Sequence, residues 1–165
     1  MNKNEAEILA NVYAQVRGLS NRFISALKDV DVNKELQLGE IKFNSPYWII
    51  AHLVWTEHFL IIEGVGGENL NIPWIDEYSF GTDPNMIKTK PPYDEILQKL
   101  EATHSRALEV IRELNDQQLD EDNYIGATFG GTKSKRNVII NAIRHEPMHI
   151  GQISWILKTY GLKFA

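Results

Sequence analysis

The chain has 165 residues, of which 43% are hydrophobic and 24% charged, and we expect one globular domain over residues 1–165. A formal charge of -5 argues against a nucleic-acid partner, because phosphate binding needs clustered positive charge. The absence of cysteine excludes disulfides, thiolate metal sites and a cysteine nucleophile. Any metal site must therefore use histidine, carboxylates or water.

The cellular compartment follows from the apolar segments. No apolar run in the sequence approaches the roughly 18 residues that a membrane span requires. The N-terminal segment reads MNKNEAEILANVY, which is polar and amphipathic and lacks the apolar centre of a signal peptide. We therefore expect a cytoplasmic protein without a membrane partner.

The first predicted helix spans about residues 4–29. Its apolar residues recur at spacings of three and four, which is typical of a helix that packs along one face. The face predicted to be buried carries Leu9, Val12, Val16, Leu19, Phe23, Leu27 and Val30.

The second predicted helix, from Pro46 to about Glu63, has clear start and stop signals. Ser45 is a typical N-cap, Pro46 suits the first helical position, and Gly64 ends the helix. We expect His58 to lie on the surface or at the flank. The seam predicted to face inward is apolar except for one histidine: Trp48, His52, Trp55, Phe59 and Ile62.

The third predicted helix begins after Pro92 and ends near Leu114, and two registers fit its hydrophobic pattern. His104 faces the core in one register and lies at the flank in the other. A structural role is the favoured interpretation of this histidine.

The fourth predicted helix begins near Thr132 or Ser134 and ends at Gly161, a residue type that commonly caps helices in the left-handed conformation. Its seam is polar only in the middle: Val138, Ala142, His145, His149, Gln152 and Ile156.

Four amphipathic helices predict an all-α fold, a four-helix bundle. The connection from Gly64 to Pro92 is too long for a tight hairpin, which favours a long crossover between the second and third helices. Trp74, Tyr78 and Phe80 lie in this connection, so we expect it to pack against the bundle and to cover one end.

The seam histidines predict a metal site. His145 and His149 project from one helix face because four residues separate them, and His52 lies within an apolar seam. An unpartnered buried polar group costs about 1–3 kcal/mol, a penalty that a divalent cation bound to neutral imidazoles would remove. Three histidines with an open position are typical of catalytic zinc. Histidines that bond only to one another are the alternative.

The string His145-Glu146-Pro147-Met148-His149 also matches the H-E-x-x-H signature of zinc proteases. We disfavour a protease, because no carboxylate or histidine follows His149 and no strand is predicted to bind a peptide. Pro147 removes a helical hydrogen bond and predicts a bend. Glu146, about 100° around the helix from His145, is a candidate general base.

The segments SPYWIIAHLVWTEHF and RHEPMHIGQI resemble the DinB-like superfamily of four-helix metalloproteins, which includes bacterial thiol transferases that use bacillithiol or mycothiol. The resemblance covers nearly the whole chain in helix order. It implies that His52, His145 and His149 bind zinc or nickel, with water at the remaining positions. Gln152 matches the family's Gly-Gln element and is expected to support the ligands from behind or to pack, without binding the metal itself, whereas Pro147 departs from the usual residues.

The resemblance also implies a reaction, in which the metal lowers the pKa of an exogenous low-molecular-weight thiol that then attacks an electrophilic small molecule. Two alternatives stay open: a metal-dependent hydrolase or isomerase that activates water, and a metal-binding, stress-related bundle without turnover. Trp55 and Trp74 are candidate substrate contacts, although packing is the favoured role for each. The resemblance to this family also suggests a homodimer.

Overall fold

The computed structural model describes residues 4–162, and four long helices dominate this part of the chain. These are α1 (Glu5–Ala26), α2 (Pro46–Glu57), α3 (Tyr93–Arg112) and α5 (Lys135–Thr159). The short elements are η1 (Leu27–Asp29), β1 (Gln37–Leu38), β2 (Ile41–Lys42), η2 (His58–Glu63), η3 (Ile75–Tyr78), η4 (Pro84–Met86) and α4 (Asp116–Leu119). The two strands pair antiparallel in the link between α1 and α2. The predicted all-α fold is confirmed.

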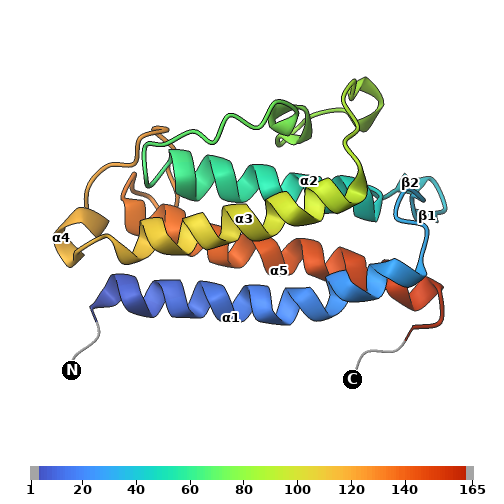
Figure 1. Cartoon of the computed structure of the whole chain (residues 1–165), viewed down its shortest axis with the longest axis horizontal. Coiled ribbons are helices and arrows are strands. Elements are labelled where there is room, and N and C mark those ends of the chain that lie inside the picture. The colour runs from blue at the N-terminus through green and yellow to red at the C-terminus, as the bar shows by residue number, and fades with distance from the viewer. Residues whose placement is uncertain (1–3, 163–165) are drawn as a thin grey trace.

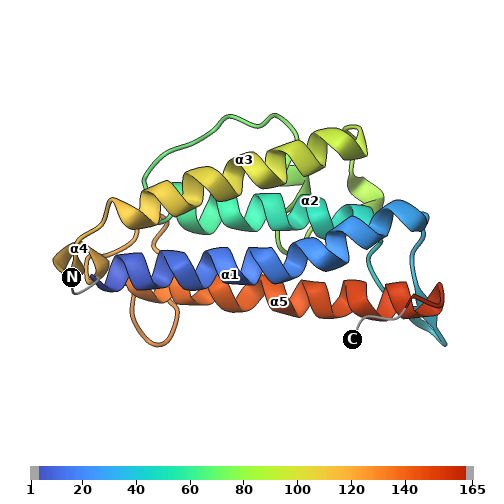
Figure 2. The same ribbon diagram turned by 60° about the horizontal axis from the view of Figure 1, so that its bottom comes forward.

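The helices form a bundle in which α1 and α5 run in one direction and α2 and α3 in the other (Figure 1). Helix α1 packs against α5 and α3, and α2 packs against the same two helices, as Figure 2 shows from a second side. Because α2 and α3 are parallel neighbours, the chain between them must return along the bundle. The predicted long crossover does this.

The helix ends follow from local chemistry. Ser45 caps α2, since its Oγ accepts a hydrogen bond from the backbone N–H of Trp48 at 3.3 Å. Ser134 caps α5 in the same way through the N–H of Asn137. Gly161 follows α5 with a φ of +76°, the left-handed conformation predicted for its cap.

The buried face of α1 differs from the predicted one. Val12 and Leu19 are 41% and 55% exposed, so the predicted apolar stripe is wrong at these two positions, whereas Leu27 is buried as predicted. The residues that α1 buries are Ala6, Ala10, Tyr13, Arg17, Ser20 and Ile24. This face includes Arg17, which pairs with two buried carboxylates on other helices, and a hydrophobic pattern does not reveal such a contact.

The crossover between α2 and α3 packs against the side of α2, and not over one end of the bundle as predicted. Trp74 and Tyr78 are buried in it, and the Trp74 Nε1–H donates to Oε1 of Glu95 at 3.0 Å. Trp74 is therefore a packing residue. Phe80, by contrast, is 86% exposed.

His58 is buried, so its predicted position at the surface or flank is wrong. It begins η2, a π-helical segment that continues directly from α2. The Nε2 atom of His58 accepts a hydrogen bond from the backbone N–H of Leu70 at 3.0 Å. The start of the crossover thus folds over this histidine and shields it from water.

The apolar interior consists of two clusters, one toward each end of the bundle. The first is built around residues such as Ile49, Leu53, Ile96, Ile153 and Leu157, and the second around residues such as Ala10, Ile61, Ile111, Leu119 and Ile139. Along each long helix, buried polar residues separate the two clusters. We call this set the polar layer: Arg17, Glu57, Thr103, His104 and Glu146.

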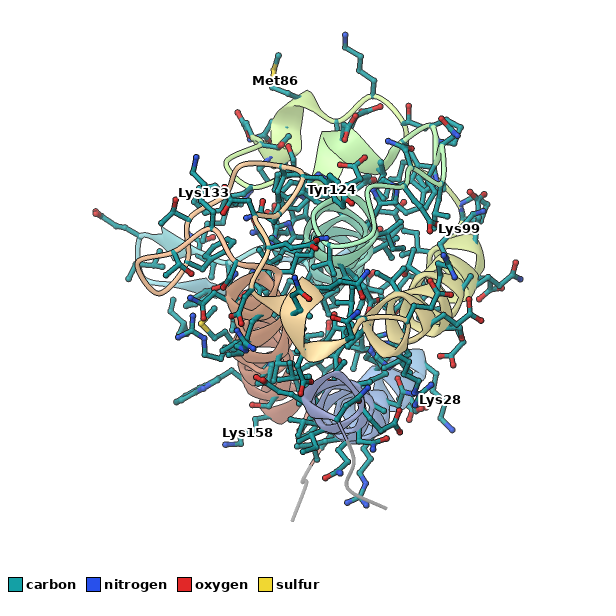
Figure 3. The ribbon with its side chains drawn as sticks, turned by 90° about the vertical axis from the view of Figure 1, so that its left-hand side faces the viewer. Lys28, Met86, Lys99, Tyr124, Lys133 and Lys158 are labelled. Atoms are coloured by element: carbon teal, nitrogen blue, oxygen red, sulfur yellow. The ribbon has the colours of Figure 1, made fainter. Side chains whose placement is uncertain are left out.

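A view along the bundle shows the four long helices around this interior, with the crossover on the outside next to α2 (Figure 3). Met86 lies at the outer edge of the crossover and is 68% exposed. Within residues 4–162, no helix has both the length and the apolar character needed to cross a lipid bilayer.

Candidate metal centre

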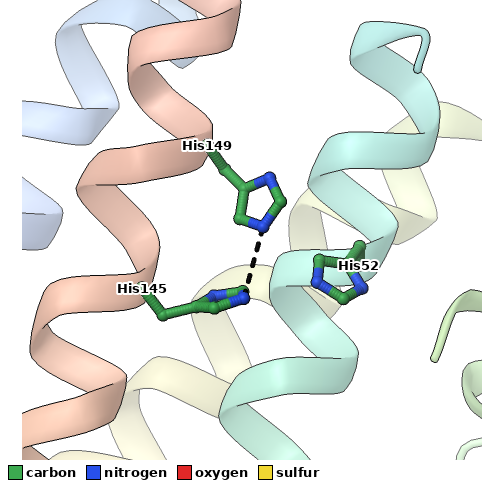
Figure 4. A group of neighbouring side chains, drawn as sticks. All are labelled: His52, His145 and His149. Carbon is green, nitrogen blue, oxygen red and sulfur yellow. Dashed lines mark hydrogen bonds between the residues drawn. The ribbon is translucent and has the colours of Figure 1, made fainter. Parts of the chain in front are cut away.

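Three histidines from two helices point toward one another in the space between α2 and α5 (Figure 4). His52 comes from α2, and His145 and His149 come from α5. Each offers a ring nitrogen, and these three atoms all lie within 4.8 Å of one another. The structure therefore brings together all three residues that the sequence singled out.

The donor atoms suit a tetrahedral cation. The Nε2 atoms of His145 and His149 lie 3.3 Å apart. Two nitrogens bound to tetrahedral zinc are separated by about 3.3 Å, because each Zn–N bond is about 2.0–2.1 Å long. The Nδ1 atoms of both rings are buried and have no hydrogen-bond partner in the described structure. Such rings gain more from a cation than from the single bond that links them.

His52 is held in one orientation and one tautomer. Its Nδ1 lies 2.7 Å from the backbone oxygen of Tyr78, which can only accept, so Nδ1 carries the proton and Nε2 the lone pair. The ring stacks between Trp48, at a centroid distance of 4.7 Å, and Trp55, at 5.4 Å. Trp55 stacks in turn on Phe59 at 5.0 Å, which makes an aromatic ladder along the helix.

The three imidazoles are neutral at physiological pH. Burial, together with the smaller effect of the neighbouring histidines, lowers the pKa of His145 to about 4 and that of His149 to about 3. Burial also lowers the pKa of His52, against the opposing effect of its hydrogen bond to Tyr78. Neutral rings can bind a cation without first releasing a proton.

The metal-free protein is expected to lose stability as the pH falls from about 6.5 toward 4. The unfolded chain takes up protons first, because the ordinary histidine pKa of about 6.5 lies above the folded values. Stability from His145 and His149 is therefore complete above pH 6.5 and declines on acidification. Melting temperatures measured with a chelator across this range test the expectation.

The double variant His145→Gln/His149→Gln is the control for this titration, and its melting temperature should depend less on pH in the same window. Equal slopes for the two proteins would contradict a role of these histidines in the acid response.

The histidine cluster borders a cavity of about 1010 Å³ that opens to solvent. Its aromatic lining residues are Trp48, Trp55, Phe59, Phe80 and Phe129, and its polar ones include Asn44, Thr56, Ser79, Thr82, Asn141 and Gln152. Among the described residues that line it, none is Asp, Glu, Lys or Arg. A cavity beside three ligands is the arrangement of catalytic sites, which leave a coordination position for substrate.

A network of buried charges crosses the polar layer. The Arg17 guanidinium donates from Nε and Nη2 to both carboxylate oxygens of Glu146, at 2.9 and 3.0 Å. Its Nη2 also donates to Oε2 of Glu57 at 3.2 Å. The other oxygen of Glu57 lies 2.7 Å from Nδ1 of His104, and the Thr103 hydroxyl donates to Glu57 at 3.3 Å. The network joins α1, α2, α3 and α5 at one level.

The position of Glu146 corrects its interpretation as a candidate general base. Its carboxylate bonds to Arg17 of α1, and Glu146 is not among the residues that line the cavity. His104 likewise belongs to the network and not to the histidine cluster, in agreement with the structural role favoured for it. Gln152 lines the cavity together with His145 and His149.

Sequence reasoning missed Arg17 and Glu57. A signal for Glu57 existed, because Glu57 is the one carboxylate in the mostly apolar segment IIAHLVWTEHFLII, and a helix that is apolar on nearly all sides is normally buried. A carboxylate at such a position needs a cationic or hydrogen-bonding partner. Arg17 has polar and apolar neighbours in equal measure, and nothing in the local sequence indicates that it is buried.

A helical bundle with a three-histidine cluster beside an open cavity defines a class of proteins that could bind a metal ion. A family model described as the DinB superfamily matches residues 12–153, which include all three histidines. The chain therefore belongs to the DinB superfamily. A comparison with curated proteins gave no match.

Proposed function

We propose that this protein is a divalent-metal-dependent transferase that joins a low-molecular-weight thiol to an electrophilic small molecule. The observation that supports the proposal best is the position of three neutral imidazoles at the wall of an open cavity. A divalent cation held there, zinc or nickel, would favour the thiolate over the thiol. The chain has no cysteine, so the thiol must be a separate molecule.

Different residues of this chain would bind the ion and orient its ligands. His52, His145 and His149 would hold the ion through their nitrogen lone pairs. The Tyr78 carbonyl and the stacked Trp48 and Trp55 rings fix the direction of the His52 donor atom. Such fixed ligands reduce the reorganisation that binding requires.

The cavity supports a reaction between two molecules. Its volume of about 1010 Å³ lies at the upper end of the range of about 300–1,000 Å³ usual for ligand pockets. In the proposed reaction the thiol proton passes to solvent, the sulfur bonds to the electrophilic carbon, and the leaving group departs with its electron pair. Trp55, which lines the cavity, is the candidate substrate contact that fits this geometry.

The absence of a carboxylate among the described cavity residues favours thiol transfer over hydrolysis. Metal-dependent hydrolases commonly place a glutamate or another base within reach of the attacking water. Both carboxylate oxygens of the nearby Glu146 accept hydrogen bonds from Arg17. A thiol of lowered pKa needs no such base.

The His52→Ala variant is expected to lose at least about 100-fold of any thiol-dependent turnover, because one of three proposed ligands is removed. The assay follows consumption of bacillithiol, and separately of glutathione, with a model electrophile such as 1-chloro-2,4-dinitrobenzene. Met86→Ala, at the outer edge of the crossover, is the control and should retain activity.

Hydrolysis of a model ester that needs metal but no thiol would replace this proposal with the hydrolase. A metal-loaded protein without turnover toward either kind of substrate would favour a binding bundle. The homodimer and the cytoplasmic location stay predictions.

A further inference from the structure

We propose that the cavity beside the histidines selects an uncharged, largely apolar electrophilic substrate with an aromatic ring, and discriminates against anionic electrophiles. This inference rests on the proposed function, because it takes the cavity as the substrate site. It concerns the part of the ligand that contacts the cavity walls.

The walls carry no formal charge that could bind an anion. Phosphates and carboxylates are usually recognised by Arg or Lys, and neither occurs among the described lining residues. Arg17, the guanidinium of the polar layer, is committed to Glu57 and Glu146 and does not line the cavity. An anion that entered would lose water without gaining a counter-charge, and this loss is costly.

The polar groups on the walls are neutral. They are hydroxyls and amides, such as those of Thr56, Asn141 and Gln152, which can orient a ligand through single hydrogen bonds. The formal charge of the chain, -5, also gives no general attraction for anions. These walls therefore suit the uncharged electrophilic substrate, and the thiol need only reach the metal through its sulfur.

Aromatic rings supply much of the remaining wall. Trp55 and Phe59, the end of the aromatic ladder, line the cavity together with Phe129 from the loop before α5. Phe80 lines it from the crossover and is 86% exposed, so a bound ring could cover it. Aromatic rings pair through stacked or edge-to-face contacts, which a planar apolar ligand can make with several of these side chains.

The test uses the metal-free protein and two probes that share a naphthalene ring, neutral 2-naphthol and anionic 2-naphthoate, at neutral pH. Removing the metal prevents the carboxylate from binding to the cation. Isothermal titration calorimetry is expected to show at least about tenfold tighter binding of naphthol, since only naphthoate carries a charge that the walls do not match. Equal affinities, or tighter binding of naphthoate, would overturn the inference.

Two variants place the binding in this cavity. Phe80→Ala should weaken naphthol binding about three- to tenfold, whereas Met86→Ala, an exposed residue of the same crossover that does not line the cavity, should not. Thr82→Lys adds a cation to the wall and should reduce the preference for naphthol. Equal effects of Phe80→Ala and Met86→Ala would contradict the assignment.

Failure of this inference can be distinguished from failure of the proposed transferase. If the protein prefers naphthol but transfers no thiol, the inferred ligand class is supported and the proposed reaction is contradicted. If the protein transfers thiols but binds naphthoate as tightly as naphthol, the proposed reaction is supported and the inferred ligand class is contradicted.

Discussion

Replacing Arg17 with methionine is expected to lower the free energy of unfolding by about 3–5 kcal/mol, because two buried carboxylates lose their cationic partner. Burial alone raises the pKa of Glu57, but the Arg17 charge and the His104 hydrogen bond outweigh it and lower the pKa. Glu57 is therefore ionised while Arg17 is present. Urea denaturation followed by circular dichroism measures the effect.

Arg22→Met is the matched control, since Arg22 is an exposed residue of the same helix. We expect it to change stability by less than about 0.5 kcal/mol. Adding Glu57→Gln and Glu146→Gln to Arg17→Met should recover part of the loss, because neutral amides cost less to bury than unpaired charges. A loss below about 1 kcal/mol in Arg17→Met would show that the network contributes little.

Replacing His149 with alanine is expected to reduce bound metal from close to one divalent ion per chain to less than a tenth of that. Two imidazoles would remain, and losing a ligand should cost more than the roughly 10–100-fold that loss of a ligand's hydrogen-bond partner costs. Elemental analysis of protein purified without a metal-affinity tag gives the stoichiometry. Native circular dichroism of the variant would confirm that it is folded.

Asn141→Ala is the control for metal content. Asn141 lies one helical turn before His145, lines the same cavity and does not belong to the histidine cluster. It should keep the metal stoichiometry of the unchanged protein. Unchanged metal in His149→Ala would rule out the proposed site, whatever the behaviour of Asn141→Ala.

The helices and the histidine cluster were predictable because their signals are local and periodic. Ser45 and Pro46 fix the start of α2, and the seam spacing then fixes the face on which His52 lies. On α5 the spacing of His145 and His149 fixes a shared face in the same way. A long connection before α3 is enough to indicate the crossover.

The parts that could not be predicted depend on contacts between distant segments. Arg17 on the buried face of α1 pairs with Glu57 and Glu146, which are 40 and 129 residues away in the sequence. His58 is buried by a crossover whose path the sequence does not define. The cavity likewise forms only where the crossover, α2 and α5 meet.

The polar layer also bears on how finely the two ligand-bearing helices are aligned. Apolar side chains can pack when two helices are shifted along each other by different amounts. The planar Arg17 guanidinium is more restrictive, because it donates to both Glu57 of α2 and Glu146 of α5 only when these helices have one relative position. Buried ion pairs of this kind are often less stable than well-packed apolar substitutes, by about 1–4 kcal/mol. A sequence optimised for thermostability alone would thus fill the layer with leucine and isoleucine. Such a bundle would melt later, but it would lose the directional contacts that help to align α2 and α5, the two helices that carry the three imidazoles.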